Sequence, residues 1–341
     1  MSEKQPSQTY KPGQATQPVE ADAAGSAAHE PPPTNPTRLQ QLDTWMEASP
    51  LHPRIVPYFA YVALLAVIGY AREPAPWTYP ILYTGQCLLV AWLLWRYRKL
   101  TPEMNFRFHW LVVPSAVFLT VGWVALGWLM AGELGTRWSA LMNGEPIGMF
   151  DYSSDNAEPN RFASTEPHYF EEQLNTSPAL AWTSLSLRLL GMSLLVPFFE
   201  ELMMRSLVLR SFQRVQQTAI GIVQVAEDLP IVGDWIMKQD WGKRYAAMPN
   251  QFARQFHETP VGAITVFGIF ASSVIFSLGH LPRDWPGAML CGAVWCLMLW
   301  WTNRAALGER KLALGPIIWS HGLTNALLWA YCVWSGDWQF M

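Results

Sequence analysis

The stretch Leu194–Arg210 reads LLVPFFEELMMRSLVLR, an apolar run that contains two adjacent carboxylates, Glu200 and Glu201, and one guanidinium, Arg205. Ionisable side chains inside a membrane helix cost free energy, and where they occur they mark functional sites. The stretch therefore predicts a membrane helix with a polar site near its middle.

The composition of the whole chain fits a membrane protein. Of 341 residues, 51% are hydrophobic and only 14% are charged, whereas soluble domains carry about 25% charged residues. The 19 Trp suit the membrane–water interfaces, where indole rings concentrate. The net charge of -3 gives no sign of a nucleic-acid partner. We expect membrane lipids around the chain and no nucleic acid.

Further apolar runs predict the fold class. A membrane helix needs about 20 mostly apolar residues. Pro197 is expected to kink or divide the run that contains the carboxylates, because proline removes a helical hydrogen bond. The sequence predicts an all-α, polytopic bundle of about seven to eight transmembrane helices, at residues 55–71, 78–95, 110–131, 180–199 continuing into 202–212, 261–280, 286–302 and 313–334.

Three regions follow from this pattern. Residues 1–40 are rich in Pro, Gln, Ala and Ser and predict a disordered tail without a cleavable signal peptide. Residues 41–177 hold the first membrane helices and an acidic loop at 132–178, and residues 178–334 hold the charged site. Lys and Arg gather in alternate loops, which places the N-terminus in the cytoplasm and the acidic loop on the other side.

Polar residues recur at helical spacing on three of the predicted helices. Glu201 and Arg205 are four apart, a spacing at which an ion pair forms readily. His321 and Asn325 are also four apart and share one face of the last helix, while Phe276 and His280 end an earlier one. Each of these patterns can also be explained without a function. His and Asn in membrane helices often only hydrogen-bond a neighbouring helix, and a Glu–Arg pair can be structural.

Taken together, the polar residues indicate hydrolysis. A carboxylate and imidazoles that converge on one point can activate water, with further donors meeting a developing oxyanion. The chain contains no H-E-x-x-H zinc helix and no G-x-S-x-G nucleophile motif. We therefore expect Glu200, His280, His321 and Asn325 to meet within about 3–6 Å of a shared point.

The order of the three motifs resembles a known family. E-E-x-x-x-R, F-x-x-x-H and H-x-x-x-N on successive membrane helices are similar to the CPBP family, the CaaX prenyl endopeptidases and bacteriocin-processing (Abi) relatives. The resemblance covers residues from about 180 to 330, and Met204 departs from the aromatic residue that many members have before the arginine. The sequence around the first motif, RLLGMSLLVPFFEELMMRSLVLR, is also similar to a bacterial subgroup found with exosortase systems, as is GDWQF near the C-terminus.

The resemblance implies a role for each motif residue. Glu200 is the general base, His280 positions the water, and His321 and Asn325 stabilise the oxyanion. Glu201, Arg205 and Phe276 support the site. Two chemistries stay open: a zinc ion held by Glu200, His280 and His321, or a metal-free glutamate mechanism. We favour the metal-free version, because Asn is a poor zinc ligand and lies one turn from His321.

The function expected from this resemblance is an intramembrane endopeptidase that hydrolyses a peptide bond at or within the bilayer. Its partners are membrane lipids and a peptide or protein substrate, and its place is the bacterial inner membrane. The alternatives are a catalytically silent CPBP-type binding or immunity protein and a proton-coupled transporter. The complete set of motifs argues against the silent protein, and the lack of a visible internal repeat argues against the transporter.

Overall fold

A computed structural model describes residues 36–71, 77–131, 174–304, 312–337 and 340. These residues form helices and turns, and no β-strand occurs among them, which confirms the all-α prediction. Most of the predicted tail and most of the acidic loop lie outside the described residues. The helices are α1 (Arg38–Ala48), α2 (His52–Ala71), α3 (Thr78–Arg96), α4 (Val112–Ala131), α7 (Pro178–Leu190), α8 (Val196–Glu201), α9 (Leu209–Ser211), α10 (Val215–Ala226), α11 (Val232–Lys238), α12 (Asp240–Ala246), α13 (Gln251–Glu258), α14 (Val266–Leu278), α15 (Trp285–Arg304) and α16 (Gly315–Ser335).

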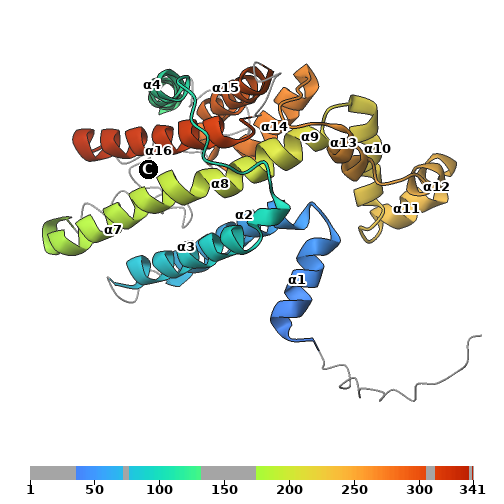
Figure 1. The fold of residues 1–341 in the computed structure, drawn as a ribbon, viewed down its shortest axis with the longest axis horizontal. Coiled ribbons are helices and arrows are strands. Elements are labelled where there is room, and N and C mark those ends of the chain that lie inside the picture. The colour runs from blue at the N-terminus through green and yellow to red at the C-terminus, as the bar shows by residue number, and fades with distance from the viewer. Residues whose placement is uncertain (1–35, 72–76, 132–173, 305–311, 338–339, 341) are drawn as a thin grey trace, which may run out of the picture. The chain divides into compact units, whose positions relative to one another are not determined.

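One long helical rod, Pro178–Ser211, organises residues 42–341, which form one compact unit. Figure 1 shows it as the continuous green-to-yellow element from α7 through α8 to α9. Two π-helical segments, η2 (Gly191–Leu195) and η3 (Leu202–Val208), flank α8 within it. The expected effect of Pro197 is therefore a local change of helix type, because η2 lies where the missing N–H of Pro197 leaves the helical ladder incomplete.

Helices occupy every range in which the sequence predicts a span. Among the described residues, two helical stretches are long and apolar enough to cross a membrane, Val112–Met130 and Pro178–Ser211. The bent pair Arg38–Ala48 and His52–Ile68 makes a third when it is counted as one span, and Val266–Leu278 is apolar but shorter. The predicted number of seven to eight spans is not confirmed by these lengths.

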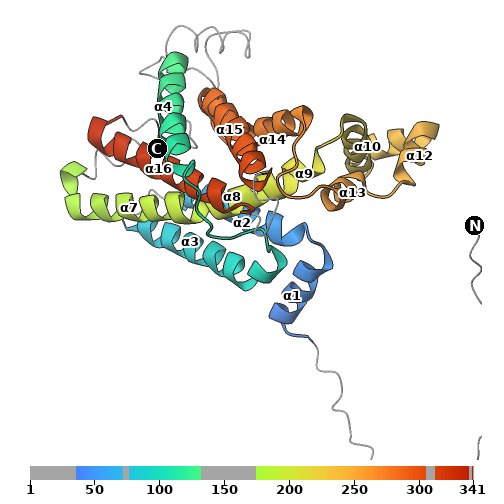
Figure 2. The same cartoon turned by 45° about the horizontal axis from the view of Figure 1, so that its top comes forward.

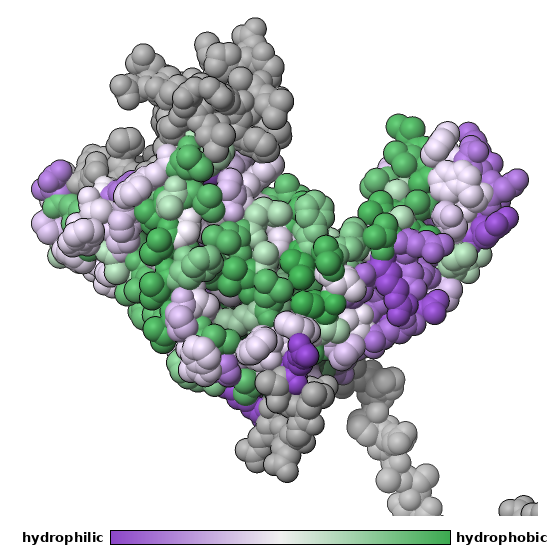
Figure 3. Space-filling view, turned by 90° about the horizontal axis from the view of Figure 1, so that it is seen from above, coloured by the Kyte–Doolittle hydropathy of each residue, from purple (hydrophilic) through white to green (hydrophobic). Residues whose placement is uncertain are grey.

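The other helices pack along the rod (Figures 1 and 2). α16 lies against η2 and α8, while α2 contacts α8 and η3 and α3 contacts α7. α14 packs on η3 and on α15, and α4 packs on α15 and α16. The shared core contains Phe199, Leu202, Leu209, Leu119 and Ile317, all fully buried. The face of the bundle seen in Figure 3 has a broad apolar area over its middle, as a lipid-facing surface requires.

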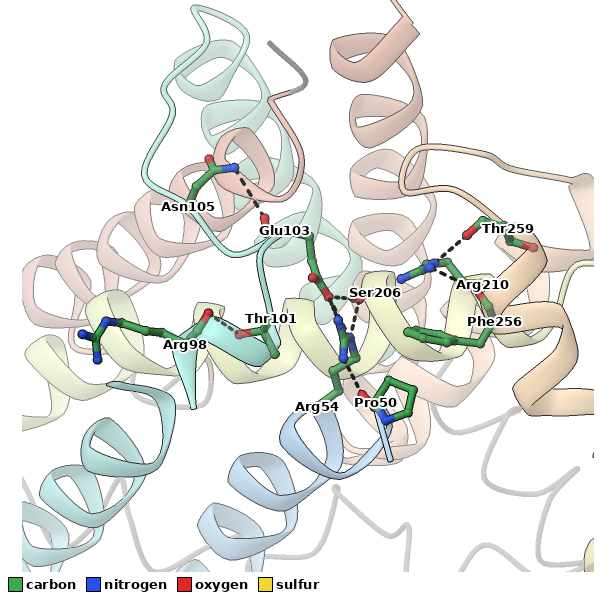
Figure 4. Close-up of polar contacts among 10 residues, drawn as sticks. All are labelled: Pro50, Arg54, Arg98, Thr101, Glu103, Asn105, Ser206, Arg210, Phe256 and Thr259. Carbon is green, nitrogen blue, oxygen red and sulfur yellow. Dashed lines mark hydrogen bonds and ion pairs between the residues drawn. The ribbon is translucent and has the colours of Figure 1, made fainter. Parts of the chain in front are cut away.

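A buried polar network fixes the start of α2 to the rod (Figure 4). Arg54 donates from Nε to Glu103 Oε1 at 2.7 Å and to Ser206 Oγ at 3.0 Å, and from Nη1 to the carbonyl of Pro50. The Ser206 hydroxyl also donates to Glu103. We call Arg54, Glu103 and Ser206 the anchor network. It joins α2, the segment before α4 and η3, and every polar group in it has a partner.

Candidate active site

The rod places the two adjacent carboxylates in different surroundings. Glu200 and Glu201 end α8, and Arg205 follows in η3. The side chains of Glu201 and Arg205 are 0% exposed, whereas 17% of the Glu200 side chain is exposed. Neighbouring helical residues point about 100° apart, which explains the separation. Only Glu200 is therefore placed to meet a substrate or water.

His321 on α16 lies between the two carboxylates. Its Nδ1 is 2.8 Å from Glu201 Oε1, and its Nε2 is 3.6 Å from Glu200 Oε2. Glu201 also forms an ion pair with Arg205 at 3.2 Å, and a carboxylate in an ion pair accepts hydrogen bonds. Nδ1 of His321 therefore carries a proton, and Nε2 is the nitrogen directed at Glu200.

A glycine allows this approach of α16 to the rod. A Cβ at Gly322 would overlap the carbonyl oxygen of Ser193, which is the oxygen four residues before Pro197. Gly322 is the residue that fits beside it, and the close contact brings the preceding His321 over the carboxylates.

Asn325 holds the same two elements together one turn further along α16. Its Nδ2 donates to the carbonyl oxygen of Met192 in η2 at 2.7 Å. One amide hydrogen is used in this bond and the second is not. Asn325 thus fixes the register of α16 against the π-helical segment while it keeps one donor for another acceptor.

His280 follows the end of α14 and lies beside the same aromatic ring as His321. The ring centroid of Phe276 is 4.7 Å from that of His280 and 6.2 Å from that of His321. Nδ1 of His280 is 3.0 Å from the carbonyl oxygen of Phe276, which can only accept, so Nδ1 carries the proton. Trp123 of α4 packs on the other side of the His280 ring at 5.6 Å.

Arg205 is enclosed by aromatic rings. Its guanidinium carbon lies 4.7 Å from the Phe276 centroid and 5.2 Å from the Trp295 centroid. None of its three side-chain nitrogens makes a well-formed hydrogen bond with the described residues. The ion pair with Glu201 and the two ring faces are therefore what holds this buried cation, and cation–π contacts of this kind strengthen when water is excluded.

Two residues of the site were not foreseen from the sequence. Trp295 of α15 stacks on His321, with 4.2 Å between centroids and 24° between the ring planes. Tyr58 of α2 packs edge-on against Phe199, and its hydroxyl interacts electrostatically with Glu200. A Cβ at Gly279 would lie 2.9 Å from this hydroxyl. Neither residue has a sequence signal, because Trp and Tyr are common in the apolar runs of this chain.

The residues predicted from sequence fall into one connected group. His321 contacts both Glu200 and Glu201, and Glu201 also contacts Arg205. Phe276 joins Arg205, His280 and His321. Asn325 lies on the η2 side of this group. The roles of these residues stay predictions, since their proximity does not by itself assign chemistry.

The described residues contain no group of three or more His, Cys, Asp and Glu side chains placed to hold one metal ion. Nδ1 of His321 is occupied by Glu201 and Nδ1 of His280 by a backbone carbonyl. These contacts leave Nε2 of both rings available, and a histidine that binds zinc through Nε2 also donates its Nδ1–H to a carboxylate or a carbonyl. The zinc and the metal-free versions of the mechanism therefore both stay predictions.

Comparison with protein families finds one match. Residues 241–327 match the family model of type II CAAX prenyl endopeptidase Rce1-like proteins. The matched range includes His280, His321 and Asn325 and ends before the described residues do, while Glu200, Glu201 and Arg205 precede it. No curated protein and no solved structure matches the chain. The resemblance to the CPBP family is confirmed over this range, and it indicates a CAAX-type membrane protease at the level of the family.

Proposed function

From the match to the Rce1-like family, we propose that this chain is an intramembrane endopeptidase that hydrolyses a peptide bond with a water activated by Glu200. The observation that supports this most is the position of His321. Its Nδ1 is fixed by Glu201 at 2.8 Å and its Nε2 lies 3.6 Å from the partly exposed Glu200. A fixed imidazole beside an accessible carboxylate is an arrangement used for general acid–base catalysis.

In the proposed reaction, Glu200 accepts a proton from water as the water oxygen attacks the peptide carbonyl carbon. His280 carries its proton on Nδ1, so its Nε2 lone pair is available to orient the water. Glu200 then returns the proton to the leaving amine as the carbon–nitrogen bond breaks. Both carboxylate and imidazole are regenerated, so the cycle balances without another reactant.

The oxyanion that forms on the carbonyl oxygen needs hydrogen-bond donors. His321 can donate from Nε2 in its doubly protonated form, while Nδ1 stays bonded to Glu201. Asn325 has a second amide hydrogen beyond the one given to Met192. Donors held in place before the reaction stabilise the developing charge without reorganisation.

The proposed mechanism is metal-free. Its substrate is a peptide or protein that reaches the site through the membrane, and its cellular place is the bacterial inner membrane, with the N-terminus in the cytoplasm. The loops after α3 and after the rod are rich in arginine and lysine, which supports this orientation. Membership of the exosortase-associated subgroup stays a hypothesis, based on two short segments of the sequence.

The test uses the full chain in lipid nanodiscs with a fluorogenic farnesylated CaaX peptide as the probe. We expect the wild-type protein to cleave the probe and Glu200→Gln to bind it without cleaving it, while both proteins show the same thermal midpoint. Binding without cleavage by the wild-type protein would favour the silent binding protein. Equal turnover in both proteins would remove Glu200 from the mechanism.

A further inference from the structure

The helices between the rod and α14 bury several polar side chains and expose several large apolar ones. We call the segment Val215–Glu258, which contains α10 to α13, the lobe. Its interior holds Gln224, Gln251 and Gln255, all less than a tenth exposed. Gln224 donates from Nε2 to the carbonyls of Tyr245 and Met248, both at 3.0 Å. Hydrogen bonds from amide side chains therefore help to hold these short helices together.

Many large apolar side chains of the lobe are exposed, although Ile220, Ile236 and Phe256 are buried. Figure 3 shows this lobe at the right, with an apolar side and a strongly hydrophilic side. Water-soluble domains bury such side chains, and contiguous exposed apolar patches mark surfaces that meet a partner or a membrane. The exposed apolar residues are Val215, Ile222, Val225, Leu229, Ile231, Val232, Trp235, Met237 and Trp241.

The most exposed of these residues is held outward by a strained turn. Ile231 has φ 71° and ψ -53°, and the N–H of Val232 donates to the carbonyl of Pro230 at 2.8 Å. This is a γ-turn with positive φ, a rare and strained conformation, and it is least favourable for a β-branched residue. Ile231 is 83% exposed. A strained turn that presents an isoleucine to solvent points to a role outside the folded core.

Aromatic and basic side chains accompany the apolar face. Trp235 and Trp241 contact each other edge-on at 5.9 Å, and both are exposed. Lys238, Lys243 and Arg244 lie in the last turns of α11 and α12, where cations also complement the helix dipole. Indole rings and basic side chains beside aliphatic ones are the composition found where proteins meet the boundary between acyl chains and headgroups.

The attachment of the lobe places it at the end of membrane helices. The rod, a candidate span, ends at Ser211, four residues before α10, and the apolar α14 begins at Val266. Arg210 donates to the carbonyls of Thr259 and Phe256 at 2.7 and 2.9 Å (Figure 4). Thr265 Oγ1 donates to the carbonyl of Gln213 at 2.9 Å. These bonds fix both ends of the lobe at the level where the chain leaves and re-enters the bilayer.

We propose that the apolar face of the lobe lies in the lipid–water boundary of the membrane. Ile231, with Trp235 and Trp241 beside it, reaches below the headgroups, and the polar exposed side of α13 faces water. The occupant of the surface is the bilayer, because the exposed residues extend over three helices and a turn that are fixed at the membrane boundary. This inference does not depend on the proposed protease activity.

The test measures depth in the full chain in phosphatidylcholine nanodiscs. A cysteine-free background, with Cys87, Cys291, Cys296 and Cys332 replaced by alanine, carries a single Ile231→Cys labelled with an environment-sensitive fluorophore. We expect quenching by lipids with a nitroxide on the acyl chain, protection from aqueous iodide, and a label depth of about 5–10 Å below the headgroup level. His257→Cys, exposed on α13, is the matched control and should show the opposite pattern.

One further label and one further substitution test whether the result at position 231 is a local effect of the Ile231→Cys change. Val225→Cys on α10 should behave like the label at 231, and Ile231→Gly, which relieves the positive φ, should retain the fold and lessen the lipid quenching of the Val225→Cys label. Iodide quenching at both 225 and 231 would overturn the proposal, since the face would then be open to water. Protection from both quenchers would overturn it as well, because a second protein copy would then cover the face.

Discussion

Arg205 and Ser206 are neighbours on the rod, yet they belong to two buried charged clusters that are built differently. In the anchor network, Arg54 bonds Glu103, Ser206 and a backbone carbonyl (Figure 4). In the candidate active site, Arg205 is fully buried and none of its nitrogens makes a well-formed hydrogen bond with the described residues. Among the described residues, Oε2 of its partner Glu201 lies 3.2 Å from Nε of Arg205 but makes no well-formed hydrogen bond.

The difference agrees with the roles proposed for the two clusters, which are packing for the anchor network and chemistry for the candidate active site. A buried polar group without a hydrogen bond costs about 1–3 kcal/mol, more when it is charged. The anchor network avoids that cost and rigidifies the packing of α2 on the rod. The active-site cluster bears it, and its histidine faces an accessible carboxylate. Clusters of this second kind are found where chemistry requires groups that are not already satisfied.

The largest effect is expected for Glu200→Gln. The amide retains the shape of the side chain but cannot accept a proton, and loss of a general base lowers turnover by about 10²–10⁴. Because 17% of this side chain is exposed, the amide remains solvated and the thermal midpoint should stay unchanged. The measurement is cleavage of the probe peptide in nanodiscs, with Glu103→Gln as the matched Glu-to-Gln change in the other cluster. A loss of turnover in Glu103→Gln as large as in Glu200→Gln would break the comparison.

The next effect concerns the Glu201–Arg205 ion pair. Removing one member leaves the other charge buried, so Glu201→Gln and Arg205→Ala should each lower the free energy of unfolding by about 3–5 kcal/mol. Glu201→Gln should also reduce turnover, since it loosens the bond that orients His321. The double variant should recover part of the stability. Thermal unfolding in detergent measures the first effect, and unchanged midpoints in both single variants would remove the ion pair from the explanation.

The anchor network should respond more mildly and in stability alone. In Glu103→Gln the cation of Arg54 keeps its bonds to Ser206 and to the Pro50 carbonyl. The loss of free energy of unfolding should therefore lie near about 3 kcal/mol, the lower end of the range for broken buried pairs. Turnover per folded molecule should not change. A stable Glu103→Gln protein with altered turnover would move this network from structure to function.

The sequence predicts the positions of the helices well, because runs of about 20 apolar residues are long signals. The spacing of Glu201 and Arg205 also predicts their ion pair, because residues four apart share a helix face. The π-helical segments were not predicted. They depend on how the carbonyls freed near Pro197 meet Gly322 and Asn325 on α16.

Contacts between residues that are distant in the sequence could not be predicted either, because they too depend on how the helices pack. His321 and Glu201 are 120 residues apart and Arg54 and Glu103 are 49 apart, so no periodicity relates them. Sequence reasoning assigned Glu201 to Arg205 alone, whereas the structure shows that it also holds His321. The whole anchor network went unnoticed, because single charged residues near the ends of apolar runs are ordinary.

A smaller effect is expected at Tyr58, whose hydroxyl lies toward Glu200 and Gly279. Tyr58→Phe removes one polar group near the base, and we expect turnover to fall by about tenfold, which corresponds to about 1.4 kcal/mol of transition-state stabilisation. Tyr61→Phe is the matched control, since Tyr61 packs on the same Phe199 ring but bonds Tyr83. The pH profile of turnover is the distinguishing measurement, because a purely structural role would leave its shape unchanged.

The smallest effect is expected from removal of metal ions. Asn325 is a poor zinc ligand and lies one turn from His321, where it suits an oxyanion donor better. A glutamate base and hydrogen-bond donors suffice for the proposed reaction, so exhaustive chelation should leave turnover and the thermal midpoint unchanged, and elemental analysis should find no stoichiometric zinc. Reversible loss of turnover that only zinc restores would contradict this and assign His280 and His321 as ligands, at about 2.0–2.1 Å from the ion. In that case the contrast between the two clusters would persist, but the unsatisfied one would be a metal site and Glu200 a ligand or the base for a zinc-bound water.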